Sequence, residues 1–128
     1  MANELILIVE DNEKNLKLAR DLLQFKGFRT IDAGTGEQAL LLAAEHAPDL
    51  ILMDIQLPGM DGITALGRLR AEPRTAAIPV VALTAFAMKD DRERFLAAGF
   101  TGYLTKPISV REFPDQVRAF CERGMSGG

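Results

Sequence analysis

Short apolar runs alternate with longer amphipathic stretches along the whole chain. This alternation is typical of a parallel sheet with helices on both faces, because each buried strand is then followed by a helix with one apolar side. The pattern predicts five units of a strand followed by a helix. Their strands are expected at Leu5–Val9, Phe28–Asp32, Asp49–Met53, Ile78–Leu83 and Thr101–Leu104.

The helices are predicted from apolar positions three or four residues apart and from the glycines and prolines that end them. The first helix has apolar residues at Leu16, Ala19, Leu22 and Leu23 and stops at Gly27, and the next three are expected at Gly36–His46, Gly62–Glu72 and Met88–Ala98. The last helix begins near Ser109 and carries an apolar stripe at Val110, Phe113, Val117 and Phe120. Because Pro114 would lose a helical hydrogen bond, we expect a distorted first turn in this helix.

The second and fifth predicted strands are less apolar than the other three, which indicates that they lie at the edges of the sheet. With right-handed crossovers, the strand order 2-1-3-4-5 meets this condition. The predicted fold class is therefore α/β, a flavodoxin-like doubly wound sheet of five parallel strands with helices on both faces.

Size and composition favour one domain. A chain of 128 residues, 48% of them apolar, is long enough for one core and too short for two ordinary domains. We expect this domain to cover residues 4–122 and to be followed by a disordered tail at 123–128, with no output domain.

Charge and apolar patterning argue against several classes of partner. A net charge of -3 without a basic run does not suit a nucleic-acid binder. The sequence has no apolar stretch long enough to span a membrane, and its first residues lack the pattern of a signal peptide. Its single cysteine, Cys121, has no internal disulfide partner and is expected to be buried. We therefore expect a cytoplasmic protein that binds neither nucleic acid nor membrane directly.

Polar residues follow the predicted strands at the ends that meet along one edge of the sheet. Asp54 ends an apolar run, where a carboxylate has little reason to stand unless chemistry needs it. Glu10 and Asp11 follow the first strand, Thr84 ends the fourth, and Lys106 lies just past the fifth. In an open sheet of this kind, ligands bind outside the carboxyl ends of the strands where the strand order reverses. These residues form the candidate site.

Three carboxylates in one crevice repel one another unless they share protons or bind a cation. Mg²⁺ fits an open site of one or two carboxylates, a backbone carbonyl and waters, and leaves positions for phosphate oxygens. A lysine and a hydroxyl beside the metal can neutralise those oxygens and donate hydrogen bonds to them. The candidate chemistry is thus metal-dependent binding of a phosphate group.

Each of these residues also has an ordinary structural explanation. Asp11 and Asn12 could cap the first helix, and Thr84 or Lys106 alone could be a structural or a solvated side chain. Tyr103 would ordinarily be a half-buried aromatic residue on an edge strand. The placement of so many of these residues on one rim of one sheet favours the functional interpretation.

Several motifs together resemble the receiver domain of bacterial two-component response regulators. The resemblance covers nearly the whole chain, from about Leu5 to Glu122, and its motifs are specific as a set: Val9-Glu10-Asp11-Asn12, Met53-Asp54, Leu57-Pro58-Gly59-Met60-Asp61-Gly62, Leu83-Thr84-Ala85 and Lys106-Pro107. Segments 55–58 and 84–89 look most like single-domain receivers of the DivK or CheY type, and also like the receivers of hybrid sensor kinases.

The resemblance implies a role for each site residue. Asp54 would accept a phosphoryl group from a histidine of a sensor histidine kinase or of a histidine phosphotransfer protein. Mg²⁺, with Mn²⁺ as a substitute, would be bound by Asp11, Asp54 and the backbone carbonyl of Gln56, and by Glu10 through water. The remaining two residues would contact the phosphoryl oxygens, Lys106 by its charge and Thr84 by its hydroxyl.

The resemblance also implies a switch and not an enzyme with a separate substrate. Movement of Thr84 towards the phosphoryl group would let Tyr103 turn inward and change the face of the fourth helix, fifth strand and fifth helix for a downstream protein. Gln56 and Phe86 would tune self-dephosphorylation, and the only other reaction expected is self-phosphorylation from small donors. Lys106–Pro107 is expected to be a cis peptide, and the protein is expected to be a monomer or a weak homodimer.

Three alternatives remain beside a single-domain regulator. The chain could be a receiver cut from a hybrid histidine kinase. A phosphatase that hydrolyses an aspartyl phosphate would need a general acid two residues after its nucleophile, where Gln56 stands. A flavodoxin-like cofactor carrier would need a glycine- and hydroxyl-rich loop after the first strand, which is acidic here.

Overall fold

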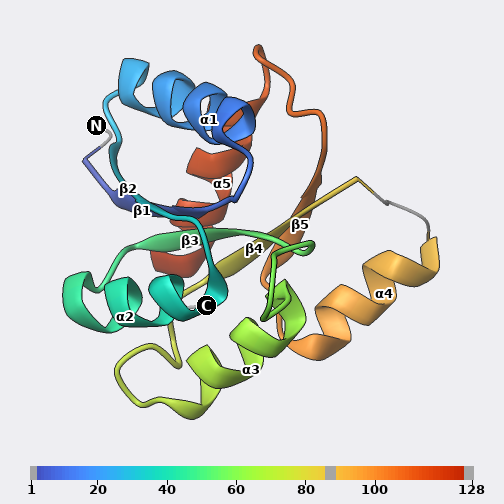
Figure 1. The fold of residues 1–128 in the computed structure, drawn as a ribbon. Helices are drawn as coiled ribbons and strands as arrows, with labels where there is room; N and C mark the ends of the chain where they lie inside the picture. The colour runs from blue at the N-terminus through green and yellow to red at the C-terminus, as the bar shows by residue number, and fades with distance from the viewer. Residues whose placement is uncertain (1–2, 86–88, 126–128) are drawn as a thin grey trace.

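Five parallel strands form one sheet in the order β2-β1-β3-β4-β5, and helices cover both of its faces (Figure 1). The computed structural model describes residues 3–85 and 89–125. The strands are β1 (Leu5–Val9), β2 (Arg29–Ala33), β3 (Leu50–Asp54), β4 (Val80–Thr84) and β5 (Gly102–Thr105). The helices are α1 (Glu13–Phe25), α2 (Gly36–His46), α3 (Gly62–Ala71), α4 (Lys89–Ala98) and α5 (Phe113–Met125).

The predicted fold class and strand order are confirmed. Every residue of β3 and β4 is buried, whereas β2 and β5 each include residues that are exposed or only partly buried. The lower apolar content of β2 and β5 thus reports their edge positions, because an edge strand has one side open to water. None of the helices in residues 3–85 and 89–125 is both long and apolar enough to cross a membrane.

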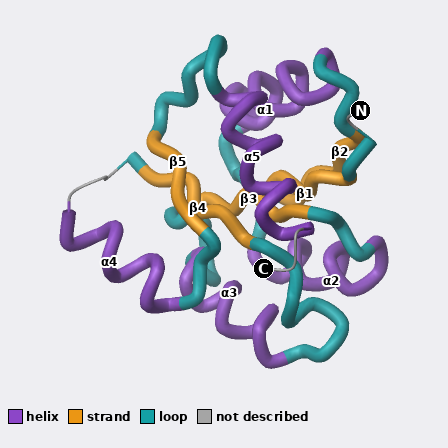
Figure 2. The backbone as a smooth tube through the Cα atoms, turned by 180° about the vertical axis from the view of Figure 1, so that it is seen from behind, coloured by secondary structure: helices purple, strands orange, loops and turns teal. Residues whose placement is uncertain are grey.

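Two apolar clusters lie on opposite faces of the sheet, with α1 and α5 over one and α2, α3 and α4 over the other (Figure 2). Alternate residues of a strand point to opposite faces. Ile6 and Ile8 therefore join the cluster under α1 and α5, while Leu7 and Val9 join the other. The central strands are fully covered, so their carboxyl ends are where polar side chains can reach solvent.

Most predicted boundaries differ from the observed ones by one or two residues, and β1 and α2 agree at both ends. β4 begins at Val80 instead of Ile78, because the Ile78 amide donates to Thr75 O at 3.1 Å and so belongs to the preceding turn. The predicted start of the fourth helix, Met88, lies outside the described residues.

The start of the last helix was predicted wrongly. Ser109 does cap a turn, since its Oγ accepts from the Glu112 amide at 3.2 Å, but α5 itself begins at Phe113. Pro114 then lies in the first helical turn, where its missing N–H costs little. Val110 is 62% exposed and does not belong to the buried stripe, which Phe113, Val117 and Phe120 do form.

The end of the chain also differs from expectation. α5 continues to Met125, so the disordered tail predicted from residue 123 is helical over its first three positions. Residues 126–128 lie outside the described part of the chain. Cys121 is 1% exposed in the last turns of α5, which confirms its predicted burial.

Candidate functional site

The site is built where the chain leaves neighbouring strands in opposite directions. After β1 it enters α1 on one face of the sheet, and after β3 it enters α3 on the other (Figure 1). The register pairs Val9 with Met53 and Thr84 with Thr105, so the carboxyl ends of these strands are nearly level. A crevice between the two diverging connections is the expected binding place in such a sheet.

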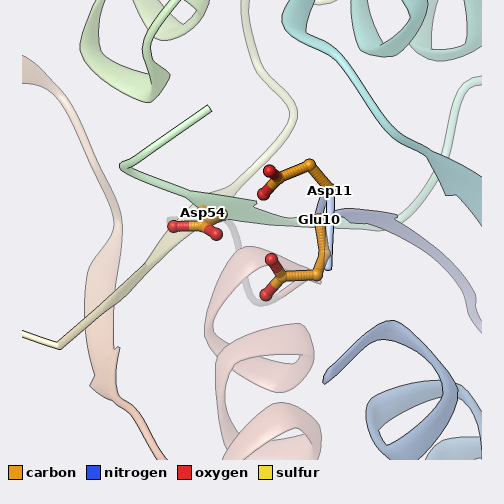
Figure 3. A group of neighbouring side chains, drawn as sticks. All are labelled: Glu10, Asp11 and Asp54. Atoms are coloured by element: carbon orange, nitrogen blue, oxygen red, sulfur yellow. The ribbon is translucent and has the colours of Figure 1, made fainter. Parts of the chain in front are cut away.

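Three carboxylates meet in this crevice. One oxygen atom from each of Glu10, Asp11 and Asp54 lies within 4.8 Å of the others, and Figure 3 shows the side chains of Asp11 and Glu10 beside Asp54. Glu10 and Asp54 are buried, with 3% and 4% of their surfaces exposed, whereas Asp11 is exposed. The structure thus brings together the acidic residues that the sequence singled out.

Lys106 contacts two of the three carboxylates. Its Nζ lies 2.7 Å from Glu10 Oε1 and 2.7 Å from Asp54 Oδ2. The backbone amide of Lys106 donates to Thr84 O at 2.8 Å, and Lys106–Pro107 is a cis peptide, as predicted. One ammonium group therefore bridges the two buried carboxylates.

Backbone amides bind the remaining oxygens of the buried carboxylates. The Gln56 amide donates to Asp54 Oδ1 at 2.9 Å, and the Asn12 amide donates to Glu10 Oε2 at 3.3 Å. Neither donor was predicted from the sequence. They could have been predicted from an acidic residue followed by a turn, because such a side chain often accepts a hydrogen bond from the amide two residues later.

Of the two residues that could have capped the first helix, Asp11 and Asn12, only Asn12 does so. Asn12 is the N-cap of α1, and its Oδ1 accepts from the Asn15 amide at 3.0 Å. Asp11 is therefore not the cap of α1, and its carboxylate lies towards the other two acids (Figure 3).

Burial and crowding change the proton affinity of the site. Burial raises the pKa of Glu10 from 4.5 to about 7, a hydrogen bond with Asp54 adds to the rise, and Lys106 opposes it. Burial lowers the pKa of Lys106, but hydrogen bonds and charge attraction from Asp54 and Glu10 outweigh this, so its pKa is raised. Lys106 therefore stays charged at neutral pH, and Glu10 binds a proton more tightly than an ordinary glutamate does.

The donor set fits a hard divalent cation. Three carboxylates and one ammonium group carry a formal charge of -2, and every side-chain ligand in the acidic cluster is an oxygen. The raised pKa of Glu10, caused by burial and by Asp54, means that the crowded carboxylates favour an added positive charge. A divalent ion beside Asp11 would supply that charge without desolvating a further amino group.

The remaining predicted residues lie around this cluster. Thr84 is 3% exposed at the end of β4, and Gln56 follows Asp54 in the turn. Tyr103 pairs with Ala82 in the β4–β5 register and packs, partly buried, against the cluster under α2, α3 and α4. Thr84 pairs with Thr105, so Thr84 and Tyr103 lie on neighbouring strands with an offset of two residues in the register. Phe86 lies outside the described residues.

Comparison with known proteins agrees with the geometry. Residues 6–118 match the family profile of the response regulator receiver domain. The polar-differentiation response regulators DivK of Brucella ovis and Brucella suis are each 49% identical over 115 residues, which is 90% of this chain and 94% of the relative.

Two solved structures are similar over nearly the whole chain. A putative response regulator from Chloroflexus aurantiacus has a TM-score of 0.88 at 30% identity, with 94% of this chain and 99% of that chain covered. The receiver domain of the sensor histidine kinase PA1611 from Pseudomonas aeruginosa has a TM-score of 0.85 at 36% identity, with the same coverage. That receiver domain holds a magnesium ion in its active site cleft.

Proposed function

The chain belongs to the response regulator receiver domain family, and from this premise we propose that Asp54 accepts a phosphoryl group from a phosphohistidine of a partner protein. The partner is a sensor histidine kinase or a histidine phosphotransfer protein. One observation carries the proposal, namely that Asp54 stands at a strand end within reach of two further carboxylates and 2.7 Å from Lys106 Nζ.

In the proposed reaction, an oxygen of Asp54 attacks phosphorus in line with the phosphorus–nitrogen bond of phosphohistidine. An oxygen–phosphorus bond forms as the phosphorus–nitrogen bond breaks. The electron pair of the broken phosphorus–nitrogen bond stays on the imidazole nitrogen, and the imidazole takes up a proton. The Gln56 amide holds Asp54 Oδ1 at 2.9 Å, so the carboxylate is oriented before the donor arrives. Oδ2 is the oxygen that Lys106 contacts.

Lys106 and Thr84 are proposed to stabilise the transferred group. Lys106 would shift its hydrogen bonds from Asp54 Oδ2 to a phosphoryl oxygen, which keeps its charge beside the developing negative charge. Thr84, buried at the end of β4, would donate its hydroxyl to a second phosphoryl oxygen. Thr84 ends β4, which precedes α4 in the chain, and Lys106 lies between β5 and α5.

Mg²⁺ is the proposed cofactor, with Mn²⁺ as a substitute. The fit of the oxygen donors and the magnesium ion in the similar receiver of PA1611 support this proposal. Asp11, Asp54 and the carbonyl of Gln56 would bind the ion directly, and Glu10 would bind it through water. The bound ion would neutralise negative charge on the incoming phosphoryl group.

Phosphorylation is proposed to act as a switch on protein binding. Movement of Thr84 would open space for Tyr103 on the neighbouring strand, and the face formed by α4, β5 and α5 would then change for a downstream protein. Gln56 and Phe86 are proposed to influence how fast water removes the phosphoryl group. The 49% identity to DivK over 94% of its length favours such a regulator over an enzyme with its own substrate.

The direct test is incubation with Mg²⁺ and phosphoramidate or acetyl phosphate, followed by intact mass measurement. Wild type should gain the mass of one phosphoryl group, and Asp54→Asn should gain none. Asp61→Asn is a matched control, because Asp61 caps α3 through its Oδ1 and asparagine caps equally well. Equal incorporation in wild type and Asp54→Asn would move the acceptor to another residue and refute the proposal.

A further inference from the structure

The described contacts of α4 with the rest of the molecule lie towards its C-terminal end. Among its described side chains, at positions 91 and 93–98, only Phe95 is buried, at 1% exposed. Phe95 packs edge-to-face on Phe100 with ring centroids 6.0 Å apart, whereas Leu96 is 47% exposed. Among these described side chains of α4, Phe95 is thus the one that enters the buried apolar cluster, beside the start of β5.

Arg70 of α3 adds a polar attachment at the same end. Its Nη1 donates to Ala76 O at 3.0 Å and to Ile78 O at 2.5 Å, and its Nη2 donates to Gly99 O at 3.1 Å. Ala76 and Ile78 lie between α3 and β4, and Gly99 directly follows α4. We call this group of Arg70 and the carbonyls of Ala76, Ile78 and Gly99 the Arg70 clamp.

The backbone at the end of α4 is bound on its other side as well. Gly99 has a φ of +112°, a conformation that other residues rarely adopt, and its amide donates to Leu96 O. Two residues on, the Thr101 amide donates to Val80 O at 2.7 Å, and Thr101 Oγ1 accepts from the Val80 amide. The end of α4 is thus joined to the start of β4, far along the sheet from the acidic site.

We propose that the Arg70 clamp is the pivot of α4, so that a change at Thr84 tilts α4 about Gly99 and leaves its C-terminal end in place. The start of α4 is tied to the site, because the chain runs to it from Thr84 at the end of β4. Its far end is held by the hydrogen bond from Arg70 Nη2 to Gly99 O, and the two hydrogen bonds of Nη1 to Ala76 O and Ile78 O fix the planar guanidinium group in place. The motion rests on the proposed function, whereas the anchoring by Arg70 does not.

The test compares wild type, Arg70→Met and Arg70→Lys by hydrogen exchange and mass spectrometry, each with and without Mg²⁺ and beryllium fluoride as a phosphoryl mimic. Arg68→Met is the matched control, since Arg68 is an exposed arginine two residues earlier on the same helix. Lysine keeps the charge but has all its donors on one nitrogen and cannot reproduce the spacing of Nη1 and Nη2, so Arg70→Lys tests the fork geometry in a protein with less risk of misfolding.

In the protein without the mimic, segment 95–101 should exchange about tenfold faster in Arg70→Met than in Arg68→Met, with Arg70→Lys in between. With the mimic, wild type should change exchange in 89–94 and not in 95–101, whereas Arg70→Met should change it in both. Equal exchange of 95–101 in the Arg70 and Arg68 variants would refute the anchor. A wild-type change as large in 95–101 as in 89–94 would refute the pivot.

The proposed function fails separately from this inference. If Asp54 takes up neither phosphoryl group nor mimic, the intact mass stays unchanged and the proposed function is refuted. The comparison of Arg70→Met with Arg68→Met in the protein without the mimic still decides whether Arg70 anchors α4.

Discussion

Glu10 lies against Asp54 and Lys106 with 3% of its surface exposed, and burial is the main cause of its raised pKa. Its place after the first strand could be predicted from the sequence, because a polar residue directly follows an apolar run. Its pKa could not be predicted from the sequence, because the shift depends on how completely residues from β1, β3 and the segment after β5 exclude water. The same holds for the two short contacts of Lys106.

The raised pKa of Glu10 predicts how stability depends on pH in the Mg²⁺-free protein. The native state binds this proton more tightly than the unfolded chain, with a pKa of about 7 against 4.5. The resulting stabilisation is fully present below pH 4.5 and is lost as the pH rises through about 7. Between about pH 5 and pH 8, the free energy of unfolding should therefore fall by on the order of 1–3 kcal/mol more in wild type than in Glu10→Gln.

Urea unfolding at several pH values, with a chelator present, measures this difference. Glu13→Gln is the control, because Glu13 is an exposed glutamate in the first turn of α1. A gap between wild type and Glu10→Gln that stays the same at every pH would contradict the assignment.

At the scale of elements, α5 and α3 differ in how well the sequence predicted them. The start of α5 was misplaced because Ser109 has real capping geometry in a turn that precedes the helix, and only packing shows that Val110 is exposed. The start of α3 at Gly62 was predicted correctly. What the sequence did not reveal is how closely Gly62 approaches β3.

A side chain at Gly62 should disturb the site through the backbone of Asp54. An added Cβ would lie 2.7 Å from Asp54 O, closer than real Cβ atoms come, and 3.0 Å from Ile55 Cα, which is also a tight contact. Gly62→Ala should therefore cost about 1–3 kcal/mol of unfolding free energy and slow phosphorylation from acetyl phosphate by moving the acceptor. Chemical denaturation and intact mass against time measure the two effects.

Gly67 provides the matched control on the same helix. No atom lies within 4 Å of a Cβ added there, so Gly67→Ala should be neutral or stabilise by up to about 1 kcal/mol. Its phosphorylation rate should equal that of wild type. If both alanine variants behaved alike, the close approach of Gly62 to β3 would not matter for the site.

At the scale of the whole molecule, metal binding should appear as stability. An ion that binds only the folded acidic cluster raises the free energy of unfolding, by about 1.4 kcal/mol at a tenfold excess of Mg²⁺ over its dissociation constant. Asp11→Asn should remove this gain while the Mg²⁺-free stability changes little, because Asp11 is exposed. Thermal unfolding with added Mg²⁺ or chelator measures it.

Asp21→Asn is the control for this prediction, since Asp21 is also an exposed aspartate, on α1, and pairs with Lys17 at the surface. It should keep the full stabilisation by Mg²⁺. A stabilisation that survives Asp11→Asn unchanged would place the cation elsewhere.

The sequence by itself determined the class of fold, the order of the strands and the identity of the acidic residues at their ends. These features depend on local patterns, because a buried strand needs a continuous apolar run and a polar residue marks where it reaches solvent. The weak apolar character of the second and fifth strands was enough to place them at the edges.

Only the tertiary structure decided what these residues do to one another. The bridge from Lys106 to Glu10 and Asp54 spans residues from three separate segments, and the raised pKa of Glu10 follows from the water that they exclude together. The hydrogen bonds of Arg70 could not be predicted from the sequence either. Its three acceptor carbonyls lie in two loops, and no sequence pattern indicates that these loops meet at Arg70. Distances between segments and the exclusion of water come from packing, and local sequence patterns carry neither.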